Sequence, residues 1–228
     1  MNATMGPATK TSRQDAEPID PLESRRRAED PRLTTVNSLR QGVRGAYSAA
    51  AEHPNRAHPF PVGRRFAESL GYPHEQLAKL PAVSVEAFAG VSNVSITADI
   101  PPGATVLDLG CGAGLDSLVA ATRTGPRGKV IGVDFSASML DRARQGSTEA
   151  GFSTIEFREA DAERLPIDGA SVDVALVNGI FNLNPMRDAI LRELARVVRP
   201  DGVVYAAELI LREPVQKPEI IDEANWFA

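Results

Sequence analysis

The sequence predicts an α/β protein whose core is a doubly wound parallel sheet, preceded by a helical segment. The first observation is a regular alternation of short apolar runs with amphipathic stretches over residues 104–211. The second is a glycine-rich turn, G-C-G-A-G over residues 110–114, directly after the first apolar run. The third is that a polar residue follows each of four apolar runs. This spacing is typical of a parallel sheet with helices on both faces.

The composition limits the classes of partner. The chain has 228 residues, 43% of them hydrophobic, which is enough for one domain with a substantial core plus appendages. Its formal net charge is -5, which argues against nucleic acid and anionic membranes as partners. No apolar run approaches the roughly 20 residues that span a bilayer. The single cysteine leaves no intrachain disulfide and no multi-cysteine metal site, and it suits a cytoplasmic protein without a metal.

The N-terminal part is expected to form a tail and a cap. Residues 1–33 are rich in proline and charge, and we predict a disordered tail. Residues 34–103 are predicted as a helical cap, with helices at 34–52, 62–70 and 74–80. The stretch F-A-G-V-S-N-V-S at 88–95 leaves loop and helix start open. His53 and His58 are five residues apart, and each precedes a proline, which argues against a metal pair on a helix.

The core domain is expected over residues 104–211. We predict strands at 105–109, 129–134, 155–158, 172–177 and 203–211. We predict helices at 115–124 and 137–150, and a third helix after Asn184-Pro185. Ser136 is expected to cap the second helix, and Leu191 is expected in the buried stripe of the third. The turn P-D-G at 200–202 leads to the last strand.

Polar residues at the strand ends predict a ligand site, because parallel sheets bind ligands at the carboxyl ends of their strands. Asp134 ends the second strand, twenty residues after Gly114, where it can accept hydrogen bonds from ribose hydroxyls. Asp161 follows the third strand, where it can hold an adenine amino group. Asn178 ends the fourth strand. Each has an ordinary explanation alone, such as a tight turn or a helix cap, but together they indicate a nucleoside-containing ligand.

Two acids beside the glycine loop indicate the charge of that ligand. The spacing is G-x-G-x-G, not the G-x-G-x-x-G of dinucleotide sites, with Asp108 before it and Asp116 after it. Carboxylates there would repel a pyrophosphate, and a buried Asp108 needs a partner. A cofactor with a positively charged amino-acid end fits better. S-adenosylmethionine carries both a sulfonium and an α-ammonium.

Four motifs resemble motifs I to IV of class I S-adenosylmethionine-dependent methyltransferases: V-L-D-L-G-C-G-A-G, V-I-G-V-D-F-S, A-D-A-E-R-L-P-I and S-V-D-V-A-L-V-N. The resemblance covers roughly residues 104–211 and implies a Rossmann-like fold. It implies that a set of loop residues surrounds the methionine moiety: Asp108, Gly110, Gly112 and Gly114, with Cys111 in the same loop.

The same resemblance implies the adenosine contacts. Asp134 would hold the ribose, Phe135 and Met139 would pack on the adenine, and Asp161 with Ala162 would meet the adenine edge. Asn178 joins this set as a candidate cofactor contact at the end of the fourth strand.

A narrower resemblance is to the arsenite methyltransferase family. It rests on D-L-G-C-G-A-G-L-D-S, V-I-G-V-D-F-S-A-S-M-L-D-R-A-R and V-N-G-I-F-N-L-N-P, and on the upstream layout of Tyr47, L-G-Y-P and F-A-G-V-S-N. Members of that family bind trivalent arsenic through three or four cysteines, since soft thiolates suit a soft metalloid. Here the stretch 88–93 has no cysteine, and Gly179 stands at another cysteine position. Cys111 is at best one weak ligand, and we interpret it as structural.

Residues 212–228, predicted as a C-terminal tail, are too few for a crossover helix and two strands. We therefore expect the terminal strands of the class I sheet to be missing. An open sheet edge recruits a partner chain, so we predict a homodimer through that edge.

The leading hypothesis is a methyltransferase acting on a small-molecule acceptor. A soft acceptor needs no base, whereas a hydroxyl acceptor does. Tyr47 and His58 are candidates because the cap can cover the site, and Asn178 and Asn182 are candidates for orienting the acceptor. Two alternatives stay open: arsenite methyl transfer with external thiols, and a non-catalytic S-adenosylmethionine-binding protein.

Overall fold

A computed structural model describes residues 31–210, with side chains from residue 37 onward. Of the predicted N-terminal tail at residues 1–33, residues 1–30 lie outside the described residues, and residues 31–33 are helical, contrary to the prediction. The predicted tail at residues 212–228 also lies outside the described residues. The chain divides into a unit that ends at Asn37 and a unit that begins at Ser38. Of the first unit, the structure describes only helical backbone. All contacts below belong to the second unit.

Five helices precede the sheet in the described chain. They are α2 (Pro31–Glu52), α3 (Arg64–Ser69), α4 (His74–Leu77), α5 (Ala82–Val85) and α6 (Val94–Thr97). Helix α2 begins three residues before the expected boundary, while α3 and α4 are shorter than predicted. Helix α5 was not predicted. The stretch left open at 88–95 is a loop up to Asn93, where α6 follows.

The sheet has five parallel strands in the order β3-β2-β1-β4-β5. The strands are β1 (Thr105–Leu109), β2 (Lys129–Asp134), β3 (Ile155–Glu159), β4 (Val172–Asn178) and β5 (Val198–Ala207). The chain winds outward from β1 to β3, then returns to the other side of β1 through β4. This order confirms the predicted doubly wound sheet and places the switch point at the end of β1, where ligands bind in such folds.

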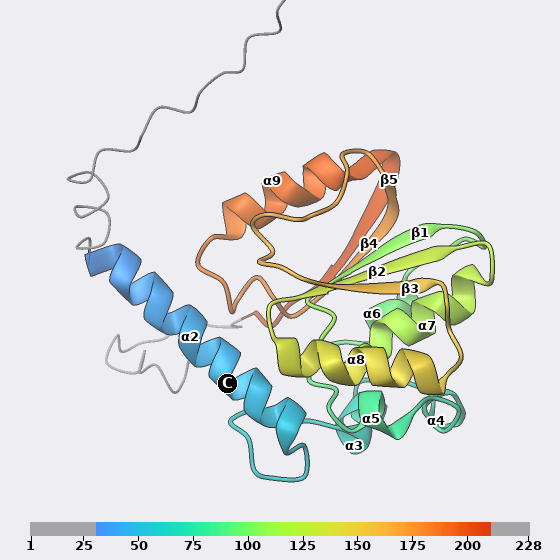
Figure 1. The fold of residues 1–228 in the computed structure, drawn as a ribbon, viewed down its shortest axis with the longest axis horizontal. Helices are drawn as coiled ribbons and strands as arrows, with labels where there is room; N and C mark the ends of the chain where they lie inside the picture. Colours follow the sequence, from blue (N-terminus) through green and yellow to red (C-terminus); the bar gives the residue numbers. More distant parts are fainter. Residues whose placement is uncertain (1–30, 211–228) are drawn as a thin grey trace, which may run out of the picture. The chain divides into compact units, whose positions relative to one another are not determined.

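Helices cover both faces of the sheet (Figure 1). They are α7 (Leu115–Thr124), α8 (Ala137–Glu149) and α9 (Arg187–Val197). Leu107 and Leu109 pack in a cluster with residues of α9, whereas Val106 packs in a cluster with residues of α7. Successive strand residues thus point to opposite faces, as the two-residue strand period requires. Asp108 therefore lies on the α7 side of β1.

Two sequence predictions about this region are wrong. Strand β5 begins at Val198 instead of residue 203, because Val198 already pairs with Val172, and the predicted P-D-G turn forms a bulge before pairing resumes at Val203. Asp201 within the bulge has a φ of 68°. Leu191 is 53% exposed, because the buried stripe of α9 consists of Ile190, Leu194 and Val197, and Leu191 lies off that stripe.

Within residues 31–210, no helix combines the length and apolarity required to cross a bilayer.

Candidate cofactor and active site

The glycine loop turns the chain from the end of β1 into α7. Gly110, Gly112 and Gly114 have φ angles of 76°, 50° and 84°, in the left-handed region that favours glycine. A Cβ built on Gly110 would lie 2.3 Å from the Ile180 side chain. The backbone N–H groups of Gly110 and Cys111 both donate to the Val133 carbonyl, at 2.8 and 3.0 Å. The loop is therefore fixed to β2, and at Gly110 the Ile180 side chain takes the place of a Cβ.

Asp134, at the end of β2, holds this loop from the side. One carboxylate oxygen accepts the N–H of Gly112 at 2.9 Å, and the other accepts the N–H of Ser136 at 2.8 Å. The side chain is 8% exposed. Burial raises the pKa of Asp134, while these backbone hydrogen bonds oppose the shift. A carboxylate has about four acceptor positions, so Asp134 can still accept a hydrogen bond from a ligand hydroxyl.

Asp108 is a buried carboxylate without a described cation. It is 2% exposed and accepts one side-chain hydrogen bond, from the Ser117 hydroxyl at 2.6 Å. Burial, and next the charge of Asp116, raise the pKa of Asp108 to about 8. No described lysine, arginine or histidine forms an ion pair with it. A positive ligand group is the partner that would favour its ionised form.

Asp116, in the first turn of α7, joins three parts of the fold. Its carboxylate accepts hydrogen bonds from the hydroxyls of Tyr72 at 2.5 Å and Ser95, and from the amide of Asn178 at 2.9 Å. It is 5% exposed. Burial raises the pKa of Asp116 and that of the Tyr72 phenol. The described hydrogen bonds of this acid therefore tie the cap to the sheet.

Asn178, at the end of β4, completes the same network. Its side-chain oxygen accepts the N–H groups of Val91 and Ser92 at 2.9 and 3.1 Å, and its amide nitrogen donates to the Ser92 carbonyl at 2.8 Å and to Asp116. These four bonds use the two acceptor and two donor positions of the amide. The network fixes the cap loop over the end of β4.

The residues assigned to the adenine lie after β2 and β3. The Phe135 ring is half-buried, with the Arg44 guanidinium 5.5 Å from its centroid. Met139 is 1% exposed and packs against Ala113 beside the glycine loop. Asp161 is exposed on a loop, and the half-buried Ala162 packs against the α9 side of the core.

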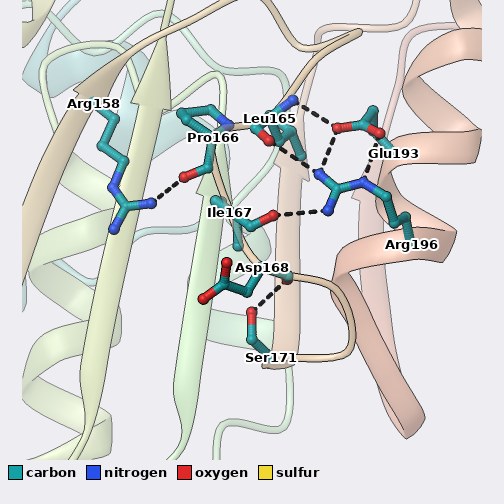
Figure 2. A network of polar contacts seen from close by, with 8 residues as sticks. All are labelled: Arg158, Leu165, Pro166, Ile167, Asp168, Ser171, Glu193 and Arg196. Carbon is teal, nitrogen blue, oxygen red and sulfur yellow. Dashed lines mark hydrogen bonds and ion pairs between the residues drawn. The ribbon is translucent and has the colours of Figure 1, made fainter. Parts of the chain in front are cut away.

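The loop that carries Asp161, residues 160–171, is held by helix α9. Figure 2 shows the Arg196 guanidinium reaching the carbonyls of Leu165 and Ile167, at 3.0 and 2.8 Å, while Glu193 accepts the Leu165 N–H at 2.7 Å. Arg158 of β3 donates to the Pro166 carbonyl. The hydrogen bond from Arg196 lowers the pKa of Glu193 to about 2. A loop without regular structure is thereby anchored at several backbone groups.

The catalytic candidates lie in different surroundings. Tyr47 stacks on Phe60 at a centroid distance of 4.5 Å, and burial, then the charges of Asp134 and Glu208, raise the pKa of its phenol. His58 bonds to the His53 carbonyl within its own loop, at 2.9 Å. The amide of Asn182 donates to the Leu209 carbonyl at 2.5 Å. Of these side chains, the structure brings Tyr47 near Asp134.

Sequence reasoning missed Glu208, which follows β5 and accepts the N–H groups of Phe181 and Asn182 at 2.6 and 3.4 Å. The rule that polar residues end the strands, extended to the fifth strand, would have found it. Sequence reasoning also missed Arg40 and Arg44 of α2, for which the only signal is their four-residue spacing on one helix face.

Cys111 is 7% exposed, and burial raises the pKa of its thiol. Among the residues that the structure describes, no group of three or more His, Cys, Asp or Glu side chains converges in a way that could hold a metal ion.

The donor set at the ends of β1 and β2 fits a ligand with a positive charge and hydroxyl groups. Asp108 lacks a described cation, and Asp134 retains acceptor capacity. S-adenosylmethionine has the ammonium, sulfonium and ribose that these residues would meet.

Comparison with known proteins agrees with this geometry. The family model described as "Methyltransferase domain" matches residues 100–225. The chain is 36% identical over 148 residues to an arsenite methyltransferase from Halobacterium salinarum, covering 65% of this chain and 38% of that protein. It is 37% identical over 106 residues to a demethylmenaquinone methyltransferase from Lactococcus lactis, covering 46% of this chain and 42% of that protein.

A solved structure is similar as well. The arsenic(III) S-adenosylmethionine methyltransferase of Chlamydomonas reinhardtii matches with a TM-score of 0.50 and 28% identity, over 63% of this chain and 48% of that chain. The chain thus spans less than half the length of each of these relatives. Because the family model covers more than half of the sequence, the chain belongs to the methyltransferase-domain family, with the class I Rossmann-like fold and with S-adenosylmethionine as the family's cofactor.

Proposed function

We propose that this chain is an S-adenosylmethionine-dependent methyltransferase that acts on a small-molecule acceptor. The observation that carries the proposal is the pair of buried carboxylates beside the glycine loop. Asp108 and Asp134 are 2% and 8% exposed, and neither forms an ion pair with a described cation. Ionising a buried carboxylate is unfavourable unless hydrogen bonds or a positive group compensate it. Asp134 already accepts two backbone N–H groups, whereas Asp108 accepts one side-chain hydrogen bond and has no ion-pair partner among the described residues.

In this proposal each acid has a separate task. Asp108 lies against the positive amino-acid end of the cofactor, and Asp134 accepts hydrogen bonds from the ribose. S-adenosylmethionine supplies an electrophilic methyl group, whose bond to sulfur breaks as the acceptor forms a new bond to it. The protein's contribution is mainly to hold both reactants in line.

Tyr47 and Glu208 are the groups we propose for the acceptor side. A phenol is protonated near neutral pH, and burial raises the pKa of Tyr47 further, so it serves as a hydrogen-bond donor that orients the acceptor. Glu208 is the carboxylate available to a hydroxyl acceptor that must lose a proton. The backbone N–H of Asn182 donates to Glu208. Asn178 acts by positioning the cap. The contacts of His58 give it no role in this proposal.

Cofactor binding is tested by titration calorimetry on the wild type, Asp134→Ala and the matched control Asp141→Ala, whose side chain is 76% exposed on α8. We expect Asp134→Ala to weaken S-adenosylmethionine binding at least about tenfold, the size of one hydrogen bond to a charged group, and Asp141→Ala to leave it unchanged. Equal affinities for all three proteins would contradict the ribose assignment.

Methyl transfer is tested by the formation of S-adenosylhomocysteine with a panel of hydroxyl, amine and thiol acceptors. Product that depends on one acceptor supports the proposal. Tight cofactor binding without product on any acceptor favours the alternative of a non-catalytic S-adenosylmethionine-binding protein.

Arsenite methylation is a second candidate, because relatives named arsenite methyltransferase match this chain at 36% identity. The chain has a single cysteine, Cys111, which is buried with a raised thiol pKa. In this candidate, external thiols such as glutathione supply the soft ligands. Methylated arsenic formed from arsenite and glutathione would support it, and no turnover would exclude it.

We also propose homodimerisation through the edge of β5. Among the described strands, β5 is one edge of the sheet and exposes Val203 and Val204, at 44% and 39%. The opposite edge, β3, instead carries Glu156 in ion pairs with Lys129 and Arg158, a charged edge of the kind that resists pairing. Light scattering that gives only monomer mass would exclude the dimer. The cytoplasmic location stays a prediction from the cysteine content.

A further inference from the structure

The part of helix α2 from Ser38 onward lies along the loops that follow β2 and β3. Its Arg40 forms ion pairs with Asp161 at 3.0 Å and with Glu163 at 3.1 Å. Four residues on, Arg44 lies 3.8 Å from the same Asp161 oxygen and covers the Phe135 ring. Another turn on, the Ser48 hydroxyl bonds to that of Ser136 at 3.0 Å. One face of α2 thus borders the region assigned to the adenine.

Asp161 is held from two sides. Its loop is anchored at the far end by Glu193 and Arg196 of α9, which bind three backbone groups of that loop (Figure 2). At the near end, Arg40 reaches both Asp161 and Glu163, and Glu163 also accepts the amide of Asn184 at 3.0 Å. The position of the Asp161 carboxylate therefore depends on tertiary contacts as well as on the turn of its own loop, in which the Arg164 N–H donates to the Asp161 carbonyl at 3.1 Å.

The two oxygens of Asp161 have different surroundings. Both arginines contact Oδ1, whereas Oδ2 has no hydrogen bond or ion pair within the described part of the chain. The side chain is 51% exposed, so a ligand can reach it. A carboxylate oxygen only accepts hydrogen bonds, so Oδ2 suits an amino group and repels a carbonyl oxygen.

We propose that Arg40 is a positioning residue for adenine recognition: by fixing Oδ1 of Asp161, it presents Oδ2 to the 6-amino group of the cofactor's purine. This inference rests on the proposed function. It concerns selection of a 6-aminopurine over a 6-oxopurine. Without Arg40, the carboxylate keeps only the longer contact of 3.8 Å with Arg44, so we expect the selection of a 6-aminopurine to decline.

The test compares S-adenosylhomocysteine with S-inosylhomocysteine, whose 6-oxopurine has a carbonyl in place of the 6-amino group and also carries a proton on N1. Dissociation constants are measured by calorimetry for the full chain as wild type, Arg40→Met, Arg40→Lys and the control Arg65→Met. Arg65 is an exposed arginine on α3 without a described ion pair. We expect the wild type to prefer the 6-amino ligand by about tenfold to a hundredfold, the size of one hydrogen bond to a charged group.

Arg40→Met is expected to weaken the 6-amino ligand until most of that preference is lost, and to change affinity for the 6-oxo ligand less than about twofold, within the range of surface ion-pair effects. The preference of Arg40→Lys for the 6-amino ligand is expected to lie between that of Arg40→Met and that of the wild type. The preference of Arg65→Met is expected to match the wild type. The 6-oxo affinity is also the internal control for folding.

The inference would be overturned if Arg40→Met weakened both ligands equally, because that result shows a purely structural role for the helix. It would also be overturned if the variant retained the full preference. A wild type that binds S-adenosylhomocysteine without any preference refutes the inference alone, whereas a wild type that binds neither ligand refutes the proposed function itself.

Discussion

Replacing Asn178 by aspartate tests the buried network that joins the cap to the sheet. The change keeps the shape of the side chain and the oxygen that accepts from Val91 and Ser92. It replaces the donor nitrogen by an oxygen that lies 2.8 Å from the Ser92 carbonyl and 2.9 Å from the Asp116 carboxylate. While the new carboxylate is ionised, both hydrogen bonds are lost and become oxygen–oxygen contacts.

The loss of unfolding free energy can be worked out from these contacts. A hydrogen bond to a neutral acceptor contributes about 1 kcal/mol and one to a charged acceptor about 1.5–3, so their loss costs about 3 kcal/mol. Two ionised carboxylates about 3 Å apart would repel by about 6 kcal/mol at an effective dielectric constant of 20. The folded protein avoids this by keeping a proton on the pair, at a cost that grows by up to about 1.4 kcal/mol per pH unit.

That proton sets the direction in which the stability of the variant changes with pH. The pair has a raised pKa in the folded variant, so its contribution to stability is present at low pH and is lost as the pH rises through the folded pKa. We expect Asn178→Asp to lose about 3 kcal/mol of unfolding free energy at pH 5.5 and about 5 kcal/mol at pH 8, relative to wild type at the same pH.

The assay is urea unfolding followed by far-ultraviolet circular dichroism at both pH values. The matched control is Asn55→Asp, the same substitution in an exposed loop, where we expect a change within about 0.5 kcal/mol. The reasoning is refuted if Asn178→Asp loses no more stability than this control, or if its loss is the same at both pH values.

Three further outcomes are expected. The Gly110→Ala variant should have a melting temperature several degrees below that of the Gly103→Ala variant. Both positions have a positive φ (76° and 83°), but only the Cβ at position 110 meets a side chain, at 2.3 Å. Equal melting temperatures would show that the backbone strain at positive φ, and not the steric clash, sets the loss of stability. S-adenosylmethionine binding at pH 6.5 should release about one proton, because Asp108 has a pKa of about 8 before binding and a positive ligand lowers that pKa. Calorimetry in two buffers of different ionisation enthalpy measures the number of protons released. The Asp108→Asn variant should release none. Glu193→Gln should lower the free energy of unfolding by about 1 kcal/mol at pH 7, since pairing with the partly exposed Arg196 holds the Glu193 pKa at about 2. The stability from this pairing is present above about pH 4.5 and is lost as the pH falls through 2. Urea unfolding should therefore show a smaller difference between variant and wild type near pH 2.

The central strands were predictable because their signal is local. The apolar runs at 105–109 and 129–134 match β1 and β2, and the expected cap appears as a hydrogen bond from the Met139 N–H to the Ser136 hydroxyl at 3.4 Å. The start of β5 was not predictable, because Val198 becomes a strand residue only by pairing with Val172 across the sheet.

The site was predictable as positions but not as contacts. The rule that ligands bind at strand ends located Asp108 and Asp134, and the glycine spacing located the loop between them. The sequence could not show that Asn178 would spend all four hydrogen-bonding positions on the cap and Asp116, because those partners are 62 to 87 residues away along the chain.

The sequence by itself determined the fold class, the glycine loop and the acidic character of the candidate cofactor site, because strand periodicity, glycine spacing and charge are properties of neighbouring residues. Only the tertiary structure decided which groups each of those acids contacts. It left Asp108 without a described cation and placed Asp116 among the hydroxyls of Tyr72 and Ser95. It also brought Arg40 to Asp161, which lies 121 positions further along the chain. Such pairings depend on which distant elements pack together, and no local pattern encodes them.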